Sequence, residues 1–245
     1  MLLPSTRAHA AGEVIGPGAK LVIRGGQCTA NFVFTDARGA RFIGMAAHCA
    51  GATSDTDTDG CRQPSLPLGT EVRIENASEP GRLAYSSWIT MQRIGERDGN
   101  ACRYNDFALV RIHPADHGRV DPTMPVFGGP IGLAPYSHAG KEVYSYGNSD
   151  LRPGGSLDAK RGRSAGTSND NWAITVSTFT PGIPGDSGSG YLDHRGRAVG
   201  VLSSLAIHPR TGSNTLVNLA KALGYVERHT SLRVRLRNGW EPFAP

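Results

Sequence analysis

The sequence predicts an all-β protein, with two small β-barrels joined by a connector and one helix near the C-terminus. Three observations support this prediction. The 32 glycines and 16 prolines among 245 residues require frequent turns, which favours many short strands. Segments of strand length occur in two series, separated by a proline-rich stretch. Hydrophobic residues make up 38% of the chain and charged residues 19%, a composition typical of a folded globular protein.

The first series of strands is predicted between residues 20 and 112. Two of its strands flank the sequence DARG, which is typical of a turn. The expected strands span residues 30–35, 41–47, 69–76, 83–94 and 106–112.

A connector without hydrophobic periodicity follows at residues 113–130, which hold four prolines. Near the end of the chain, Leu216, Leu219 and Leu223 recur at helical spacing and predict a helix over residues 216–230. The second series of strands is expected at residues 141–147, 171–180, 188–194, 197–207 and 213–219.

These patterns divide the chain into three regions. Residues 1–19 are predicted to form a flexible or loosely docked arm. Residues 20–120 form the first barrel, and residues 121–245 hold the connector, the second barrel and the helix.

The net charge of +5 comes mostly from scattered basic residues, with clusters at Lys160–Arg163 and Arg233–Arg237. In the second cluster arginine alternates with Val and Leu, so a strand there would have one cationic and one apolar face. We expect a solvated strand face and no nucleic-acid partner; attraction to acidic surfaces or nucleic acid is the alternative. No apolar run approaches the roughly 20 residues that span a bilayer, so no membrane span is expected.

The cysteines form no CxxC pair and have no zinc-site spacing to histidine, so no metal site is expected. The four are Cys28, Cys49, Cys61 and Cys102. Three disulfide connectivities are possible, and the even count favours an oxidising compartment. The N-terminus lacks a signal-peptide pattern, because Pro4 and Arg7 interrupt its apolar start. Either a leader was removed, or the chain is not exported by means of a signal peptide. The cysteines favour the first alternative, because they indicate an oxidising compartment.

The stretch PGIPGDSGSG at residues 181–190 places Ser187 among four glycines and two prolines. These residue types dominate turns, so an ordinary surface loop would explain them. The alternative is a nucleophile on a tight bend, whose small neighbours let a substrate approach. Acyl transfer through this serine would require a base, an orienting acid and donors for the oxyanion.

Two further residues fit the roles of base and acid. His48 ends an apolar strand in GMAAHCA, although a lone histidine at such a place is more often structural. Asp106 directly precedes the apolar strand FALV, although acids also flank strands as caps. Each residue is weak evidence alone, and their combination with Ser187 is stronger.

The motifs AAHC, NDFALV and GDSG occur in that order and together resemble the chymotrypsin-like serine proteases over residues 20–230. The forms PGDSG and NTLVNLAKALGYV are similar to the bacterial secreted branch, such as the streptogrisins and alpha-lytic protease. The resemblance implies two six-stranded antiparallel β-barrels with the site in the cleft between them. It also implies a disulfide between Cys28 and Cys49, which leaves Cys61 with Cys102.

The resemblance assigns a role to each residue. Ser187 attacks the scissile carbonyl, His48 accepts its proton, and Asp106 orients the imidazole. The amides of Gly185 and Ser187 form the oxyanion hole. Ser203 matches the family serine beside the triad aspartate.

The resemblance also indicates which residues would contact the substrate, and some of them differ from the residues of trypsin-like members. The expected contact residues are Pro181, Ser203, Ser204 and Leu205. Trypsin-like members have an acid six residues before the serine, where this chain has Pro181, so cleavage after Lys or Arg is not expected. Leu205 would narrow the specificity pocket, and a medium or large apolar residue is expected before the scissile bond. Asp186 is expected to pair with an internal group.

The sequence therefore predicts a secreted, monomeric serine endopeptidase that acts on polypeptides without a cofactor or a metal. A protease-like binding module with weak or no activity, and an esterase using the same triad, are the alternatives. The sequence DTDTDG at residues 55–60 matches the first half of a calcium loop. Leu66 stands where that loop needs a bidentate acid, so a solvated acidic turn is expected.

Overall fold

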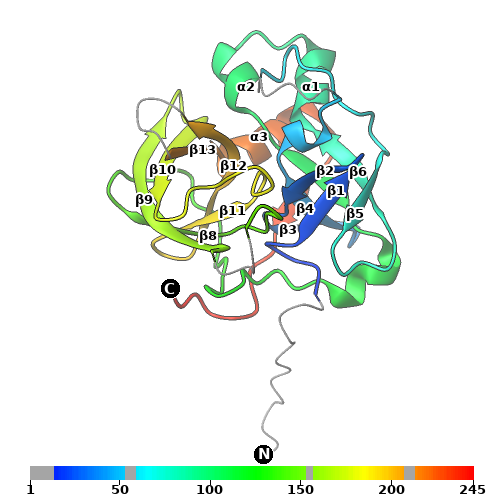
Figure 1. Ribbon diagram of the computed structural model, residues 1–245. Coiled ribbons are helices and arrows are strands. Elements are labelled where there is room, and N and C mark those ends of the chain that lie inside the picture. Colours follow the sequence, from blue (N-terminus) through cyan, green and yellow to red (C-terminus); the bar gives the residue numbers. More distant parts are fainter. Residues whose placement is uncertain (1–13, 53–58, 153–156, 207–212) are drawn as a thin grey trace, which may run out of the picture.

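The computed structural model describes residues 14–52, 59–152, 157–206 and 213–245, which form an eight-stranded sheet and a closed six-stranded barrel (Figure 1). In chain order the elements are β1 (Lys20–Ile23), β2 (Gly26–Thr29), β3 (Val33–Asp36), β4 (Arg41–Met45), η1 (Ala47–Ala50), β5 (Glu71–Ile74), β6 (Gly81–Ser86), α1 (Ser87–Ile94), α2 (Gly99–Tyr104), β7 (Ala108–Arg111), η2 (Pro114–Arg119), β8 (Glu142–Tyr146), β9 (Ala159–Ser168), β10 (Ala173–Thr178), β11 (Gly190–Asp193), β12 (Ala198–Ala206), β13 (Ser213–Asn218), α3 (Leu219–His229) and β14 (Val234–Leu236). The predicted all-β class with a C-terminal helix is confirmed.

The first sheet has the strand order β14-β3-β4-β7-β6-β5-β1-β2. It contains eight strands rather than the predicted six, partly because β14 returns from the C-terminus to pair with β3. Val234 of β14 is buried and Arg235 is exposed, as the alternating pattern predicts. Of the predicted N-terminal arm, residues 1–13 lie outside the described part of the chain, whereas Ile15 is fully buried and bridges Val120.

The second sheet closes as β10-β13-β12-β11-β8-β9, with every neighbouring pair antiparallel. This confirms the predicted six-stranded barrel. Its strand β9 has no counterpart among the predicted strands. Lys160 and Ser164 occupy buried positions of β9, so its inward face is partly polar and carries no apolar alternation.

The prediction of a strand over residues 83–94 is wrong in its second half. The strand β6 ends at Ser86, and α1 then continues to Ile94. Trp88 and Met91, three residues apart, are buried on one face of this helix, and Gly95 ends it in a left-handed conformation. Apolar residues at helical and at strand spacing are hard to separate over so short a run.

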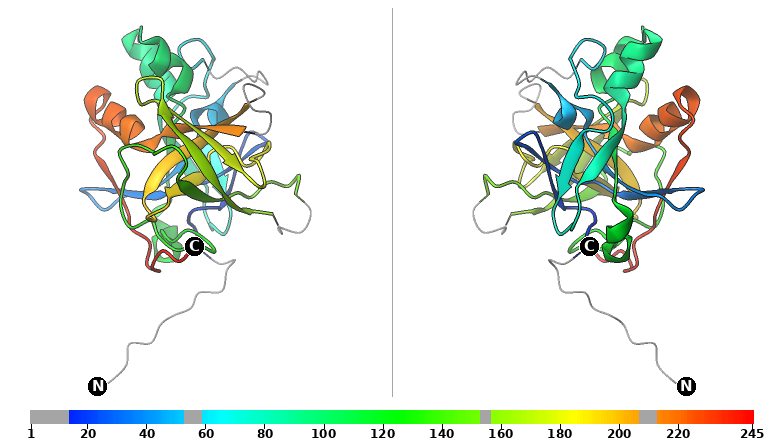
Figure 2. Two further views of the ribbon diagram at one scale, coloured as in Figure 1. Left: turned by 90° about the vertical axis from the view of Figure 1, so that its left-hand side faces the viewer. Right: turned by 90° about the vertical axis from the view of Figure 1, so that its right-hand side faces the viewer.

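The helix α3 begins at Leu219 rather than at residue 216, because Leu216 belongs to β13. The side chain of Asn218 caps α3 by accepting hydrogen bonds from Ala220 N and Lys221 N. The helix contacts α1, which lies in the first half of the molecule with the eight-stranded sheet, and it contacts β12 and β13 of the barrel, which forms the second half. It therefore lies against both halves (Figure 2). None of the helices in the described part of the chain is long and apolar enough to cross a membrane.

One apolar cluster joins the two halves. It includes Phe32 and Phe107 from the first half and Leu192 and Val201 from the barrel, all 0% exposed. A Cβ at Gly190 would lie 2.7 Å from the Phe32 ring, so this glycine permits the close packing. This shared core fixes the barrel against the first sheet and places the loop before β11 beside β4.

Candidate active site

His48 and Asp106 meet because they follow and precede two paired strands. Strand β4 pairs with β7 in a register that places Met45 opposite Ala108. The chain turns into η1 directly after β4, which brings His48 over the start of β7. The His48 amide donates to Asp106 Oδ1 at 2.7 Å, and His48 Nδ1 lies 2.6 Å from Asp106 Oδ2. One carboxylate thus holds both the backbone and the ring of His48.

Ser203 supplies a third hydrogen bond to the same carboxylate, from the other half of the molecule. Its Oγ donates to Asp106 Oδ2 at 2.6 Å. Asp106 is 0% exposed and Ser203 is 8% exposed, while 24% of the His48 side chain remains accessible. The buried acid therefore connects the first sheet with β12, and the imidazole reaches the surface.

The electrostatics of this pair favour a charged carboxylate beside a basic imidazole. Burial alone would raise the pKa of Asp106, but the charge of His48 and hydrogen bonds from His48 and Ser203 lower it below its ordinary value. Burial opposes the imidazolium, yet the Asp106 charge and hydrogen bond raise the pKa of His48 above 6.5.

The loop that carries Ser187 is tied to the first sheet. Thr29 N donates to Ser187 O at 2.8 Å, and Asn31 Nδ2 donates to Gly188 O at 3.1 Å. A Cβ at Gly188 would lie 2.6 Å from Thr29 O and 2.9 Å from Ala46 N, so only glycine allows this approach. The loop therefore packs against the chain two residues before His48.

Ser187 is half-buried, and its Oγ makes no hydrogen bond to any residue that the structure describes. Hydrogen bonds between a nucleophile and its base are often long in enzymes without substrate, and they shorten when substrate binds. The structure thus brings the Ser187 loop beside the His48 segment, and it joins His48, Asp106 and Ser203 directly.

A turn at Gly185 shapes the segment before Ser187. Asp186 N donates to Ile183 O at 2.9 Å, and Gly185 has φ +96°, which together define a type II turn with Pro184 at its second position. Within the described part of the chain, the amides of Gly185 and Ser187 donate no hydrogen bond. Both amides are therefore available to an acceptor.

Two hydroxyls hold the carbonyls on either side of the Gly185 amide. Ser149 Oγ donates to Pro184 O at 2.6 Å, and Thr29 Oγ1 donates to Gly185 O at 2.8 Å. Ser149 is 5% exposed, and its Oγ also accepts from Leu151 N. Because N–H and C=O point in opposite directions across a trans peptide, the Ser149 bond directs the Gly185 N–H away from Ser149. No motif in the sequence points to Ser149.

Asp186, next to the serine, lies in a buried ion cluster. Arg152 Nη2 is 2.9 Å and Lys160 Nζ is 3.3 Å from Asp186 Oδ2, and the Asp186 and Lys160 side chains are 0% exposed. Burial lowers the pKa of Lys160, although Asp186 opposes that shift. Arg152 and Lys160 are thus the internal groups with which Asp186 pairs, and no sequence motif identified them. A buried carboxylate without such partners would be strongly destabilising.

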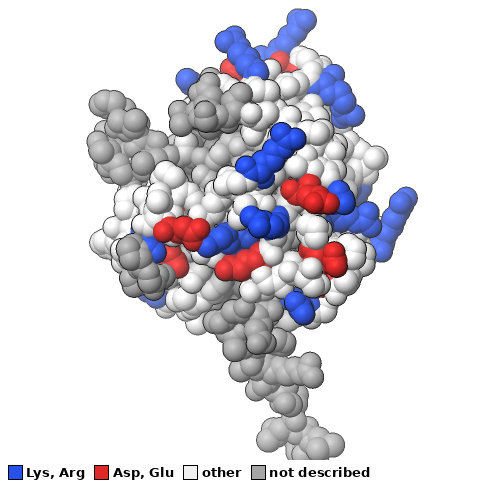
Figure 3. All heavy atoms as spheres, turned by 45° about the vertical axis from the view of Figure 1, so that its right-hand side comes forward, with Lys and Arg blue, Asp and Glu red and all other residues white. Residues whose placement is uncertain are grey.

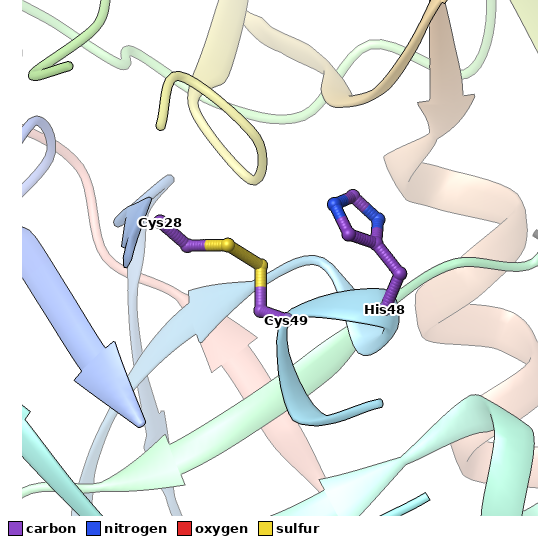
Figure 4. A group of neighbouring side chains, drawn as sticks. All are labelled: Cys28, His48 and Cys49. Atoms are coloured by element: carbon purple, nitrogen blue, oxygen red, sulfur yellow. A yellow bond between two sulfur atoms is a disulfide. The ribbon is translucent and has the colours of Figure 1, made fainter. Parts of the chain in front are cut away.

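The predicted disulfides Cys28–Cys49 and Cys61–Cys102 are both formed. Figure 4 shows that Cys49 and His48 leave the same turn in different directions, so the disulfide anchors the segment that carries the imidazole. The sulfur atoms near His48 and near Asp59 belong to these disulfides and are not thiolate ligands. The acidic turn considered for calcium falls mostly on residues 53–58, outside the described residues.

The expected substrate positions lie on two facing segments. Pro181 begins the segment that leads to Ser187, and Ser203 and Ser204 lie in β12. The backbone of Leu205 pairs with Asn214 of β13, and its side chain lies outside the described part of the structure. Sequence reasoning did not single out Asn214.

A family model described as a trypsin-like peptidase domain matches residues 29–201, which is more than half of the chain. No curated protein matches the sequence.

Several solved structures share the fold at low identity. Protease A of Thermobifida fusca is 17% identical, with 92% of this chain and 100% of that chain covered and a TM-score of 0.59. Nocardiopsis protease is 18% identical, with 91% and 98% covered and a TM-score of 0.53. Cellulomonas bogoriensis chymotrypsin is 17% identical, with 91% and 98% covered and a TM-score of 0.54. These likenesses support the fold.

The ion cluster leads to a prediction about Gly147. A Cβ at this position would lie 2.1 Å from Asp186 Oδ1 and 2.5 Å from Lys160 Nζ. We expect Gly147→Ala to lower the free energy of unfolding by about 3 kcal/mol, because the ions cannot separate without losing their partners. Chemical denaturation measures the change.

Gly118→Ala is the matched control, because a Cβ there meets no atom within 4 Å. We expect it to change the free energy of unfolding by less than about 0.5 kcal/mol. Equal stability of the two variants would contradict the account of the cluster.

Proposed function

The chain belongs to the trypsin-like peptidase family and is a serine-type peptidase, and from that premise we propose that it is a secreted endopeptidase with the triad His48, Asp106 and Ser187. The observation that carries the proposal is the buried Asp106 carboxylate, which accepts hydrogen bonds from the backbone and ring of His48. The loop of Ser187 packs against the same segment. In this proposal the first half supplies the base and the acid, and the barrel supplies the nucleophile.

The proposed reaction begins at the nitrogen of His48 that Asp106 does not hold. Nε2 accepts the proton of Ser187 Oγ while this oxygen bonds to the scissile carbonyl carbon, and the carbonyl electrons move to its oxygen. When the intermediate collapses, the C–N bond breaks and the amine takes the proton from His48. Water then hydrolyses the acyl-serine by the same steps, with His48 again acting first as base and then as acid.

The raised pKa of His48 determines how this activity depends on pH. The imidazole must be neutral to accept the Ser187 proton, and it is protonated at a pH below its pKa. Because Asp106 raises that pKa above 6.5, the acid limb of the pH profile moves to higher pH than an isolated histidine would give.

The amides of Gly185 and Ser187 are proposed to bind the oxyanion. The type II turn, the positive φ at Gly185 and the absence of competing acceptors among the described residues support this role. Ser149 is a positioning residue in this proposal, because its hydrogen bond to Pro184 O sets the direction of the Gly185 N–H. Thr29 fixes the following carbonyl.

Secretion and a polypeptide substrate complete the proposal. Two disulfides in a protein of this size favour an oxidising compartment. Pro181 stands where an acid would be needed to bind Lys or Arg, which supports a specificity unlike that of trypsin. On the face shown in Figure 3, basic side chains lie interspersed with acidic ones, an arrangement that does not favour a polyanionic partner.

A serine-directed fluorophosphonate probe tests the nucleophile. We expect labelling of the wild-type protein and none of Ser187→Ala, because the probe requires an activated hydroxyl. The control Ser189→Ala removes a hydroxyl two residues away and should still be labelled. Folded wild-type protein that stays unlabelled would instead support an inactive binding module, and labelled protein that cleaves esters but no peptide would support an esterase.

The role of Ser149 gives a separate prediction. Loss of an oxyanion donor costs about 10²–10³ in kcat; Ser149→Ala only loosens one donor, so we expect kcat to fall about tenfold with KM little changed. Binding of a peptide aldehyde, which forms a tetrahedral adduct, should weaken by a similar factor. Steady-state kinetics and inhibitor titration measure both effects.

Ser137→Ala is the control for this substitution, because Ser137 is also buried and its hydrogen bonds run through its backbone to Thr167. Its kcat and aldehyde affinity should match those of the wild type. If Ser149→Ala raised KM and left kcat and aldehyde affinity unchanged, Ser149 would have no part in orienting the amide.

A further inference from the structure

We propose that Asn214 closes the base of the pocket for the substrate residue before the scissile bond, so that this peptidase cleaves after small residues such as Gly, Ala or Ser. The inference rests on the proposed function and adds a substrate class to it. It differs from the sequence-based expectation of a medium or large apolar residue at this position.

The position of this pocket follows from the proposed site. The scissile carbon must lie against Ser187 Oγ, with its oxygen towards the amide of Gly185. An extended substrate pairing with residues 203–205 then runs beside β12. The side chain of the residue before the scissile bond enters the gap between residues 181–185 on one side and 203–205 on the other.

The carboxamide of Asn214 lies between these two walls and bonds to both. Its Oδ1 accepts from Gly182 N at 2.8 Å, and its Nδ2 donates to Gly182 O at 3.2 Å. Nδ2 also lies 3.4 Å from Ser204 O, its acceptor on the opposite wall. Asn214 is 1% exposed, so the amide is buried in this position. A side chain that joins both walls leaves only the space above it for the substrate.

The remaining space near Gly182 is also occupied. A Cβ at Gly182 would lie 2.5 Å from Leu202 Cδ2 and 3.2 Å from Asn214 Nδ2. Leu202 is 3% exposed and belongs to the same strand as Ser204. The Leu202 side chain and the Asn214 amide therefore leave no room at the base of the gap for one further carbon atom on Gly182.

The wall on the side of Ser187 is held at both ends, so it does not readily move to widen the gap. Arg152 Nη2 donates to Pro181 O and to Asp186 Oδ2, and this arginine side chain is 8% exposed. Asp186 Oδ2 also accepts from Ile183 N at 3.1 Å. A large substrate side chain would have to displace the Asn214 amide and leave the Gly182 N–H and C=O buried without partners, which is unfavourable. A methyl or hydroxymethyl side chain avoids this conflict.

A series of tetrapeptide anilides that differ only in the residue before the anilide bond tests the inference. For the wild type we expect the highest kcat/KM with Ala and at least a tenfold lower value with Leu, Phe or Lys. Asn214→Ala and Asn214→Gly should open the base and raise kcat/KM for Leu or Phe relative to Ala by at least tenfold. Wild-type kcat/KM that is highest for Phe or Lys would overturn the inference.

Asn218→Ala is the matched control, because Asn218 lies in the same strand and is equally buried, but its side chain caps α3. It should keep the wild-type order of substrates; an Asn218→Ala variant that shifted the order as much as Asn214→Ala would overturn the inference.

If both Asn214 variants fail to fold, the wild type alone decides by its inhibition with tetrapeptide boronic acids that end in Ala or Phe. Tighter binding of the Ala inhibitor supports the inference, and tighter binding of the Phe inhibitor contradicts it. Labelling of Ser187 by the fluorophosphonate probe distinguishes a failure of the pocket inference from a failure of the proposed function. A labelled enzyme with no preference for small residues refutes the pocket closure alone, whereas an unlabelled protein that cleaves no peptide refutes the proposed function as well.

Discussion

The site depends on the hydrogen bonds that the buried carboxylate of Asp106 accepts. Removing a carboxylate from water is costly unless hydrogen bonds and an opposite charge compensate it. Here the compensating groups are the amide and ring of His48 on one side and the hydroxyl of Ser203 on the other. Because Ser203 lies in β12 of the barrel, the same carboxylate also connects the two halves of the molecule. The requirement to satisfy one buried acid therefore fixes both the imidazole and the strand proposed to bind substrate.

A second buried acid, Asp186, organises the loop of Ser187 by the same principle. Its charge is compensated by Arg152 and Lys160, and Arg152 extends the restraint to Pro181. The type II turn between Ile183 and Asp186 then depends on hydroxyls from distant segments rather than on local sequence alone. Preorganised amides are effective because they need no rearrangement when the oxyanion forms. The ion cluster is thus a structural support for the chemistry proposed at the neighbouring serine.

Turn residues and apolar runs predicted the all-β class with two barrels and the C-terminal helix, because these patterns depend on local residue types. The disulfide pairing and the six strands of the closed barrel followed from the family resemblance of the ordered motifs, since the cysteine positions alone left three pairings open. The sequence did not predict α1, since apolar residues within eight positions fit a strand as well as a helix. Strand β9 was missed because its buried positions hold Lys160 and Ser164, which local hydrophobicity cannot indicate. The roles proposed for Ser149 and Asn214 depend on contacts with residues more than 30 positions away, so no local pattern indicates them.

In the proposed site, the Asp106 carboxylate holds His48 as a base with a raised pKa. NMR titration of the His48 imidazole tests this most directly. We expect a His48 pKa above 6.5 in the wild type and a lower one in Asp106→Asn, because loss of the carboxylate charge leaves burial to disfavour the imidazolium. A wild-type pKa at or below 6.5 that Asp106→Asn does not change would contradict the account.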